Sequence, residues 1–171
     1  MLKLIGLSLI LTASSAMGLG LARTVRRQQA QTLALIDALL RIRHELLYRL
    51  TPLPEIFTVL SGSRNREIAD FFSQLASMLS SMQACTVSYA CRKAFAQTRG
   101  LCLSSAAQDT LLSLFDSLGK YDTEGSVQAI DLALSRLREE AKALQSGAAA
   151  RCRTYLTLGI CTGLAMAVIL I

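Results

Sequence analysis

The chain has 171 residues, of which 52% are hydrophobic and 18% are charged, and its formal net charge is +6. This length suits a single domain with membrane segments and is too short for a multidomain enzyme. The two prolines and ten glycines exclude collagen-like and low-complexity sequences. All twelve Asp and Glu residues lie between Arg23 and Arg153, so the apolar excess gathers at the two ends of the chain.

The first predicted element is a transmembrane helix over residues 1–22. Positions 4–22 hold nineteen uncharged residues, close to the roughly 20 that cross a hydrocarbon core. A cleavable signal peptide is the competing interpretation. The charged region before the apolar stretch is only Lys3, however, and three arginines follow the stretch within five residues. This arrangement favours a retained helix.

Residues 23–153 are predicted to form a helical domain, because apolar residues recur at helical spacing and no segment alternates as a half-buried strand does. The expected helices cover 26–50, 52–60, 64–82, 87–98, a segment that begins after Ser104 or Ser105 and ends at 118, and 123–144. In the first of these, Leu40 and Leu47 broaden the apolar stripe, which is expected to pack against more than one helix. Short connections make successive helices antiparallel, so the fold class is an all-α antiparallel bundle.

Two turns of this bundle are candidates for a functional surface. In Thr51-Pro-Leu-Pro-Glu55, the Thr51 side chain is expected to cap the second helix, with Pro52 at the first helical position. Gly119 is placed to end a helix in the left-handed conformation shortly before Asp122. In an antiparallel bundle tethered at both chain ends, and with a first helix about 37 Å long, both turns are expected at the end remote from the bilayer.

The last predicted element is a second transmembrane helix over residues 154–171, of which 155–171 are seventeen uncharged residues. Five arginines flank the two spans on the domain side, against Lys3 alone on the other side. The positive-inside rule therefore places the domain in the cytoplasm. The predicted topology is a hairpin whose two legs cross the membrane.

Residues with catalytic chemistry are sparse. The five cysteines are odd in number and none forms a C-x-x-C pair, which indicates neither a disulfide framework nor a zinc site. His44 is the only histidine, expected at the surface, and adjacent Glu139 and Glu140 are expected to be solvated. No phosphate-binding G-x-x-x-x-G-K-[ST] run occurs. We therefore predict no cofactor, no metal and no enzymatic activity. The alternative is a membrane enzyme that uses one of three cysteines: Cys85, Cys91 or Cys102.

The balance of basic and acidic residues in the domain indicates which partners it binds. Basic residues outnumber acidic ones in the domain, and six arginines lie between residues 23 and 49. Anionic membrane lipid is the simplest partner for such a segment next to a bilayer. Nucleic acid is disfavoured, because the basic residues lack interleaved aromatics and a reading motif. These features alone favour a membrane-anchored lipid-binding or signalling adaptor, and they leave a homo-oligomer open.

Four motifs carry a more specific resemblance: Met1-Leu-Lys-Leu-Ile-Gly6, Thr51-Pro-Leu-Pro-Glu55, Leu118-Gly-Lys-Tyr-Asp122 and Arg153-Thr-Tyr-Leu-Thr-Leu-Gly159. With these at their places between two terminal spans, the whole sequence resembles the stage III sporulation protein AB family. The resemblance implies a protein of the mother-cell membrane that faces the forespore in endospore-forming bacteria. It also implies a domain similar to the cytoplasmic domain of type II secretion platform proteins.

The implied function is that of a non-enzymatic scaffold in a secretion-like channel complex between mother cell and forespore. The implied partners are a secretion-type ATPase, similar to stage III sporulation protein AA, and other stage III sporulation channel proteins. The candidate partner-binding residues are Thr51, Pro52, Pro54, Glu55, Gly119 and Asp122.

Overall fold

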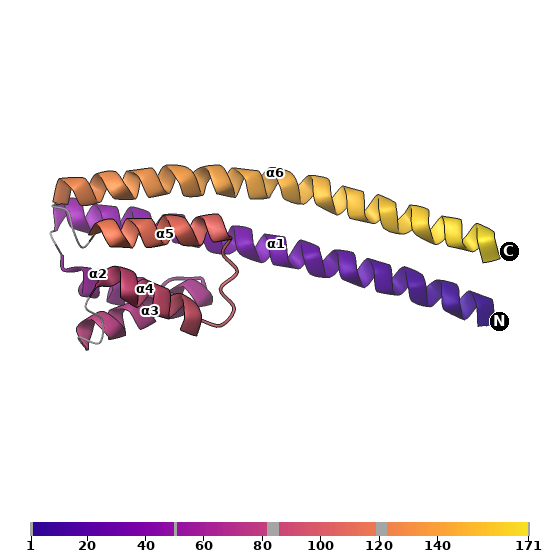
Figure 1. Ribbon diagram of the computed structural model, residues 1–171, viewed down its shortest axis with the longest axis horizontal. Coiled ribbons are helices and arrows are strands. Elements are labelled where there is room, and N and C mark those ends of the chain that lie inside the picture. The colour runs from indigo at the N-terminus through magenta and orange to yellow at the C-terminus, as the bar shows by residue number, and fades with distance from the viewer. Residues whose placement is uncertain (1, 50, 82–85, 119–122, 171) are drawn as a thin grey trace. The chain divides into compact units, whose positions relative to one another are not determined.

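The computed structural model describes the backbone of residues 2–49, 51–81, 86–118 and 123–170, and the side chains of 23–49, 51–81, 86–118 and 124–147. Over these ranges the chain forms six helices and no strand (Figure 1). The helices are α1 (Leu2–Tyr48), α2 (Leu53–Leu60), α3 (Arg66–Ser80), α4 (Val87–Gln97), α5 (Ser105–Leu118) and α6 (Thr123–Leu170). The predicted all-α class is confirmed, and the predicted bounds of α2 to α5 are correct to within two residues.

The chain divides into two compact units, one of Gln28–Ala141 and one that combines Met1–Arg27 with Lys142–Ile171. Both α1 and α6 continue as helices through the domain boundaries predicted at residues 22 and 153. Among the side chains that the structure describes, no helix is long and apolar enough to cross a membrane. The predicted spans, 4–22 and 155–171, lie outside those side chains and stay predictions.

Capping side chains fix where three helices of the larger unit begin. Asn65 and Thr86 each accept a hydrogen bond from a backbone N–H three residues ahead, at 3.2 and 3.3 Å. The Ser104 hydroxyl oxygen accepts one from Ala107 N at 3.0 Å, so Ser104 is the cap of α5. Each bond satisfies a backbone donor that the helix itself leaves without a partner.

The start of α2 corrects the sequence prediction. Pro52, not Thr51, occupies the N-cap position, with φ −60° and ψ 140° and no side-chain capping bond. The Thr51 hydroxyl instead donates to Glu45 Oε2 of α1 at 3.1 Å. This charge-assisted bond orients the Thr51 side chain toward α1. Pro54 lies in the first turn of α2, where no intrahelical N–H bond is lost.

The core of the larger unit contains an aromatic cluster built from all five phenylalanines of the chain. The ring of Phe57 in α2 lies 5.7 Å from Phe72 of α3 and meets Phe115 of α5 edge-on at 5.8 Å. Phe71 lies 4.9 Å from Phe95 of α4. Apolar residues of α1 and α6 are buried with this cluster: Leu35, Leu39, Ile42, Ile130, Leu134, Leu137 and Ala141.

Polar contacts tie α1 to distant parts of the larger unit. Gln31 is fully buried; its Nε2 donates to Gly100 O at 3.0 Å, and its Oε1 accepts from Cys102 N at 2.6 Å. Gly100 has a φ of 88°, which glycine adopts without strain. On the α6 side, Arg43 donates to both carboxylate oxygens of Asp131, at 2.8 and 3.3 Å.

A further polar contact joins α5 to α6 and corrects a second prediction. The Ser104 hydroxyl donates to the carboxylate of Glu140. Glu140 is therefore half-buried and bonded, and it is not the solvated residue that the sequence suggested, whereas Glu139 is exposed as predicted. The difference arises because the two side chains diverge around α6, so that only Glu140 faces the start of α5.

Candidate functional site

The described candidate residues lie in the connection between α1 and α2. Pro52 and Glu55 are exposed there, whereas Thr51 and Pro54 are half-buried. Within the larger unit, α1 ends, α5 ends and α6 begins at the same end of the bundle as this connection (Figure 1). Gly119 and Asp122 lie outside the described residues, so their place beside the connection stays a prediction.

Hydrogen bonds fix the α1–α2 connection to both of the helices that it joins. The carbonyl oxygen of Pro52 accepts hydrogen bonds from Glu55 N at 3.0 Å and from Ile56 N at 3.2 Å. Ile56 is buried in the core, and Thr51 is bonded to Glu45 of α1. Glu55 lies in the first turn of α2, where the helix dipole stabilises a negative charge. The connection therefore presents an exposed carboxylate from a fixed backbone.

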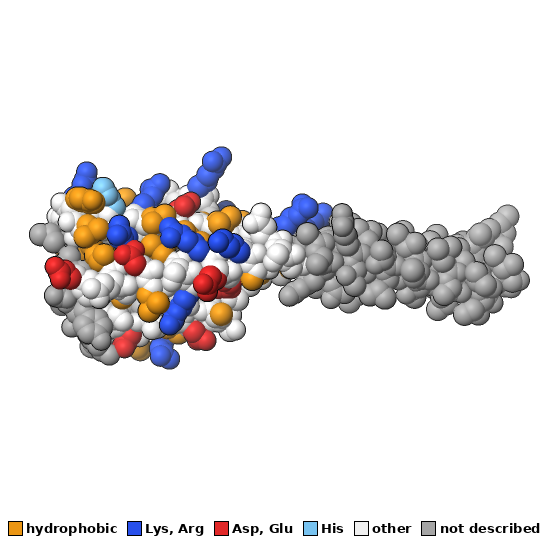
Figure 2. Space-filling view, turned by 90° about the horizontal axis from the view of Figure 1, so that it is seen from above, with side chains coloured by type: hydrophobic (Ala, Val, Ile, Leu, Met, Phe, Trp, Pro, Cys, Tyr) orange, Lys and Arg blue, Asp and Glu red, His pale blue; other side chains and the backbone are white. Residues whose placement is uncertain are grey.

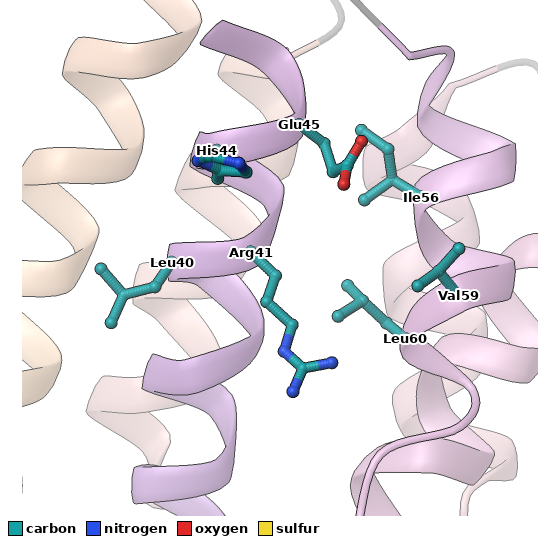
Figure 3. Close-up of a pocket in the computed structure, with 7 residues that line it drawn as sticks. All are labelled: Leu40, Arg41, His44, Glu45, Ile56, Val59 and Leu60. Carbon is teal, nitrogen blue, oxygen red and sulfur yellow. The ribbon is translucent and has the colours of Figure 1, made fainter. Parts of the chain in front are cut away.

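A groove lies directly beside this connection, between α1 and α2. The first part of the groove has a volume of about 360 Å³ and is lined by Leu40, Arg41, His44, Glu45, Ile56, Val59 and Leu60. Figure 3 shows the Arg41 side chain reaching into the space between the two helices. In the same view Glu45 points toward Ile56, and Leu40 points to the opposite side of α1.

A second hollow of about 600 Å³ continues along α1. Its lining residues are Ala30, Leu33, Ala34, Asp37, Ala38, Arg41, Leu60, Gly62, Ser63, Arg64 and Asn65. Because Arg41 and Leu60 line both hollows, the two form one continuous surface, which we name the α1–α2 groove. All of its residues belong to the larger unit.

The sequence prediction missed this groove. It assigned Leu40 and Leu47 to a stripe that packs against several helices, but both side chains are exposed. Leu33 and Val59 are also exposed, by 48% and 65% of their surface. The sequence did contain a sign of an uncovered apolar face, because Leu33, Leu40 and Leu47 recur every seven residues. This spacing places them on a face of α1 distinct from the buried face, which holds Leu35, Leu39 and Ile42.

The cysteine and histidine side chains of the described residues do not gather into a cluster. Burial raises the pKa of the Cys91 thiol above its ordinary 9.0, and nearby Arg92 offsets this only in part. A thiol kept protonated is a poor nucleophile. Cys102 is half-buried, Cys85 lies outside the described residues, and His44 is exposed with its ring 4.8 Å from Tyr48. Over the described residues, no three His, Cys, Asp or Glu side chains gather as a metal site would require.

These observations define the chain as an all-α protein whose larger unit presents a turn at one end of a helical bundle and a groove along α1. The family model described as Stage III sporulation protein AB matches residues 3–171, and the chain therefore belongs to that family. A solved structure of Stage III sporulation protein AB (SpoIIIAB) has the same fold, with a TM-score of 0.66 and 19% sequence identity. The match covers 72% of this chain and 97% of that structure. No curated protein sequence matches.

Proposed function

We propose that this protein is a non-enzymatic platform of the sporulation complex. It is anchored in the mother-cell membrane by residues 1–22 and 154–171, and its helical domain docks a secretion-type ATPase in the cytoplasm. The observation that carries the proposal is the family match over residues 3–171, which includes both apolar ends and the domain between them. A strain that lacks the protein should fail in forespore development, and normal development in that strain would refute the proposal.

The docking surface for the ATPase is proposed at the α1–α2 connection, together with the turn that contains Gly119 and Asp122. Glu55 supports this choice, because it is exposed and fixed at the start of α2. Charged residues at the rim of an interface steer association and contribute little to the folding of either partner. A charge reversal at this position should therefore weaken docking and leave the domain folded.

The test combines Glu55→Lys with Asp122→Lys in the full-length protein. The double variant should insert in the membrane, keep its helical circular dichroism and lose most of the co-purifying ATPase. Asp109→Lys is the matched control, because Asp109 is an exposed carboxylate on α5 near the opposite end of the bundle. Undiminished ATPase yield from the double variant would show that the contact surface lies elsewhere.

A second candidate function is a lipid-binding or signalling adaptor, which the exposed side chains of Arg23 and Arg26 favour. Juxtamembrane arginines each contribute roughly 1 kcal/mol of attraction to an anionic leaflet. Flotation with vesicles that contain anionic lipid, compared with neutral vesicles, distinguishes the two functions. Salt-sensitive binding to anionic vesicles without any ATPase association would favour the adaptor over the platform.

A further inference from the structure

We propose that the α1–α2 groove binds an acidic amphipathic helix of another protein in the same complex. The helix lays its apolar side chains on Leu33 and Val59, and it places carboxylates against Arg41 and Arg64. The proposal rests on the scaffold role proposed above, but it concerns a surface other than the Glu55 turn. The two surfaces can therefore be tested separately.

The apolar part of the groove lacks an intramolecular cover. Leu33 and Val59 expose 48% and 65% of their surface, although they line a concave surface. Leu60 lies on the floor of both hollows and is buried. Amphipathic helices bind such grooves through apolar anchors spaced three, four and seven residues apart. Burial of these two exposed side chains would give such a helix its main favourable contribution.

The charged side chains of the groove indicate which charge the partner helix carries. Arg41 reaches between α1 and α2 (Figure 3), and Arg64 lines the second hollow; both are exposed. Within the described residues, Arg43 and Arg49 are among the arginines that form ion pairs, whereas neither Arg41 nor Arg64 has a carboxylate partner. Arginine binds carboxylates with two parallel hydrogen bonds, so these two side chains are suited to acidic residues on the partner.

A membrane surface fits the groove poorly. Lipid headgroups are bound by clusters of roughly four to eight Lys and Arg residues. The groove holds two arginines and His44, and its walls also carry Asp37 and Glu45, which repel a uniformly anionic surface. The coloured part of the face in Figure 2 likewise mixes basic, acidic and hydrophobic side chains.

A second copy of this chain is also disfavoured as the occupant. In a two-fold symmetric contact the same patch faces itself, so two concave grooves would meet and neither would fill the other. A separate acidic helix fills the groove. It can also place neutral or basic residues opposite Asp37 and Glu45, which would exclude uniformly acidic competitors.

The test is photo-crosslinking in sporulating cells with the full-length protein. Val59→p-benzoylphenylalanine places the probe on the groove wall, and Leu132→p-benzoylphenylalanine is the control, because Leu132 is a 55% exposed side chain on α6. Mass spectrometry of the Val59 adduct should identify a segment of another protein with carboxylates and apolar residues at helical spacing. Arg41→Glu with Arg64→Glu should reduce this adduct about tenfold, because like charges then oppose the contact.

Two controls connect the result to the arginines. Arg138→Glu reverses an exposed arginine on α6 and should leave the Val59 adduct unchanged. Replacement of the crosslinked carboxylates by lysine on the partner should restore the adduct with the doubly reversed groove. If the double reversal lowers the helical circular dichroism signal, Arg41→Gln and Arg64→Gln remove the charges instead and should still reduce the adduct.

Several outcomes would overturn the proposal. They are an adduct with lipid, with a second copy of this chain or with a basic segment, and an adduct that persists after both charge changes. The absence of any adduct specific to Val59 would also overturn it. If the ATPase still co-purifies in that case, the proposed platform function stands and only the groove assignment fails.

Discussion

The buried side chain of Gln31 offers the sharpest test of how the connection between α4 and α5 is held. Gln31 bonds Gly100 O and Cys102 N with its two amide atoms, across about 70 residues of sequence. Gln31→Leu keeps a side chain of similar size and removes both hydrogen bonds. The backbone carbonyl of Gly100 and the N–H of Cys102 then lose their partner.

The expected magnitude follows from the exposure of these two backbone groups. A buried polar group without a partner costs about 1–3 kcal/mol. Gly100 is exposed and Cys102 is half-buried, so water can replace part of what Gln31 supplied. We therefore take about 1–1.5 kcal/mol for each group, or about 2–3 kcal/mol together. This corresponds to about a 30- to 150-fold rise in the local opening equilibrium.

Hydrogen exchange of the Cys102 amide measures this opening directly. In the native protein the amide should be protected, and Gln31→Leu should accelerate its exchange by the factor above. Gln97→Leu is the control, since Gln97 is exposed at the end of α4 and its change should stay within about 0.5 kcal/mol. Unchanged exchange at Cys102 in the Gln31 variant would refute the claim that this side chain holds the connection.

Four further predictions concern stability. Phe57→Ala leaves a cavity against two other phenylalanine rings and should lower the free energy of unfolding in urea by about 3–5 kcal/mol; a loss below about 1 kcal/mol would contradict its central place. Ser104→Ala removes the cap of α5 and the contact with α6, and should lower the same free energy by about 1–2 kcal/mol. A double-mutant cycle of Arg43→Ala and Asp131→Ala should give a coupling energy of about 0.2–1 kcal/mol, because the pair is largely exposed; a coupling insensitive to 1 M salt would speak against this screening. Because burial raises the pKa of Cys91, its contribution to stability should be constant below the ordinary thiol pKa of 9.0 and fall as pH rises above it. Urea titrations at several pH values should show that Cys91→Ala removes this part of the fall.

The positions of the helices in the larger unit could be predicted from local patterns. Apolar residues three and four positions apart identified the buried faces of α1, α3 and α6, and the serine before α5 was named as one of two candidate caps. These features depend on residues within one or two turns of each other, so a single sequence contains them in full. The same reasoning failed at Thr51, because the group that binds its hydroxyl, Glu45, belongs to the preceding helix.

Only part of the candidate site could be predicted from local sequence patterns. The Thr51–Glu55 turn was predicted from its prolines and from a family resemblance. Glu55 is exposed there, and the role of the turn in binding a partner stays a prediction. The α1–α2 groove was not predicted, although the three leucines at seven-residue spacing on α1 could have indicated an uncovered face. Periodicity marks a face as apolar but does not state what covers it.

The sequence by itself determined the helical class, the order of the helices, most of their inward residues and the family to which the chain belongs. Only the tertiary structure decided which faces meet: Gln31 with the segment around Gly100, and Arg43 with Asp131, residues 88 positions apart. The physical reason is that an amphipathic helix gains nearly the same burial from any apolar neighbour. Its actual neighbours are selected by side-chain shapes and polar partners that come together only when the whole bundle packs.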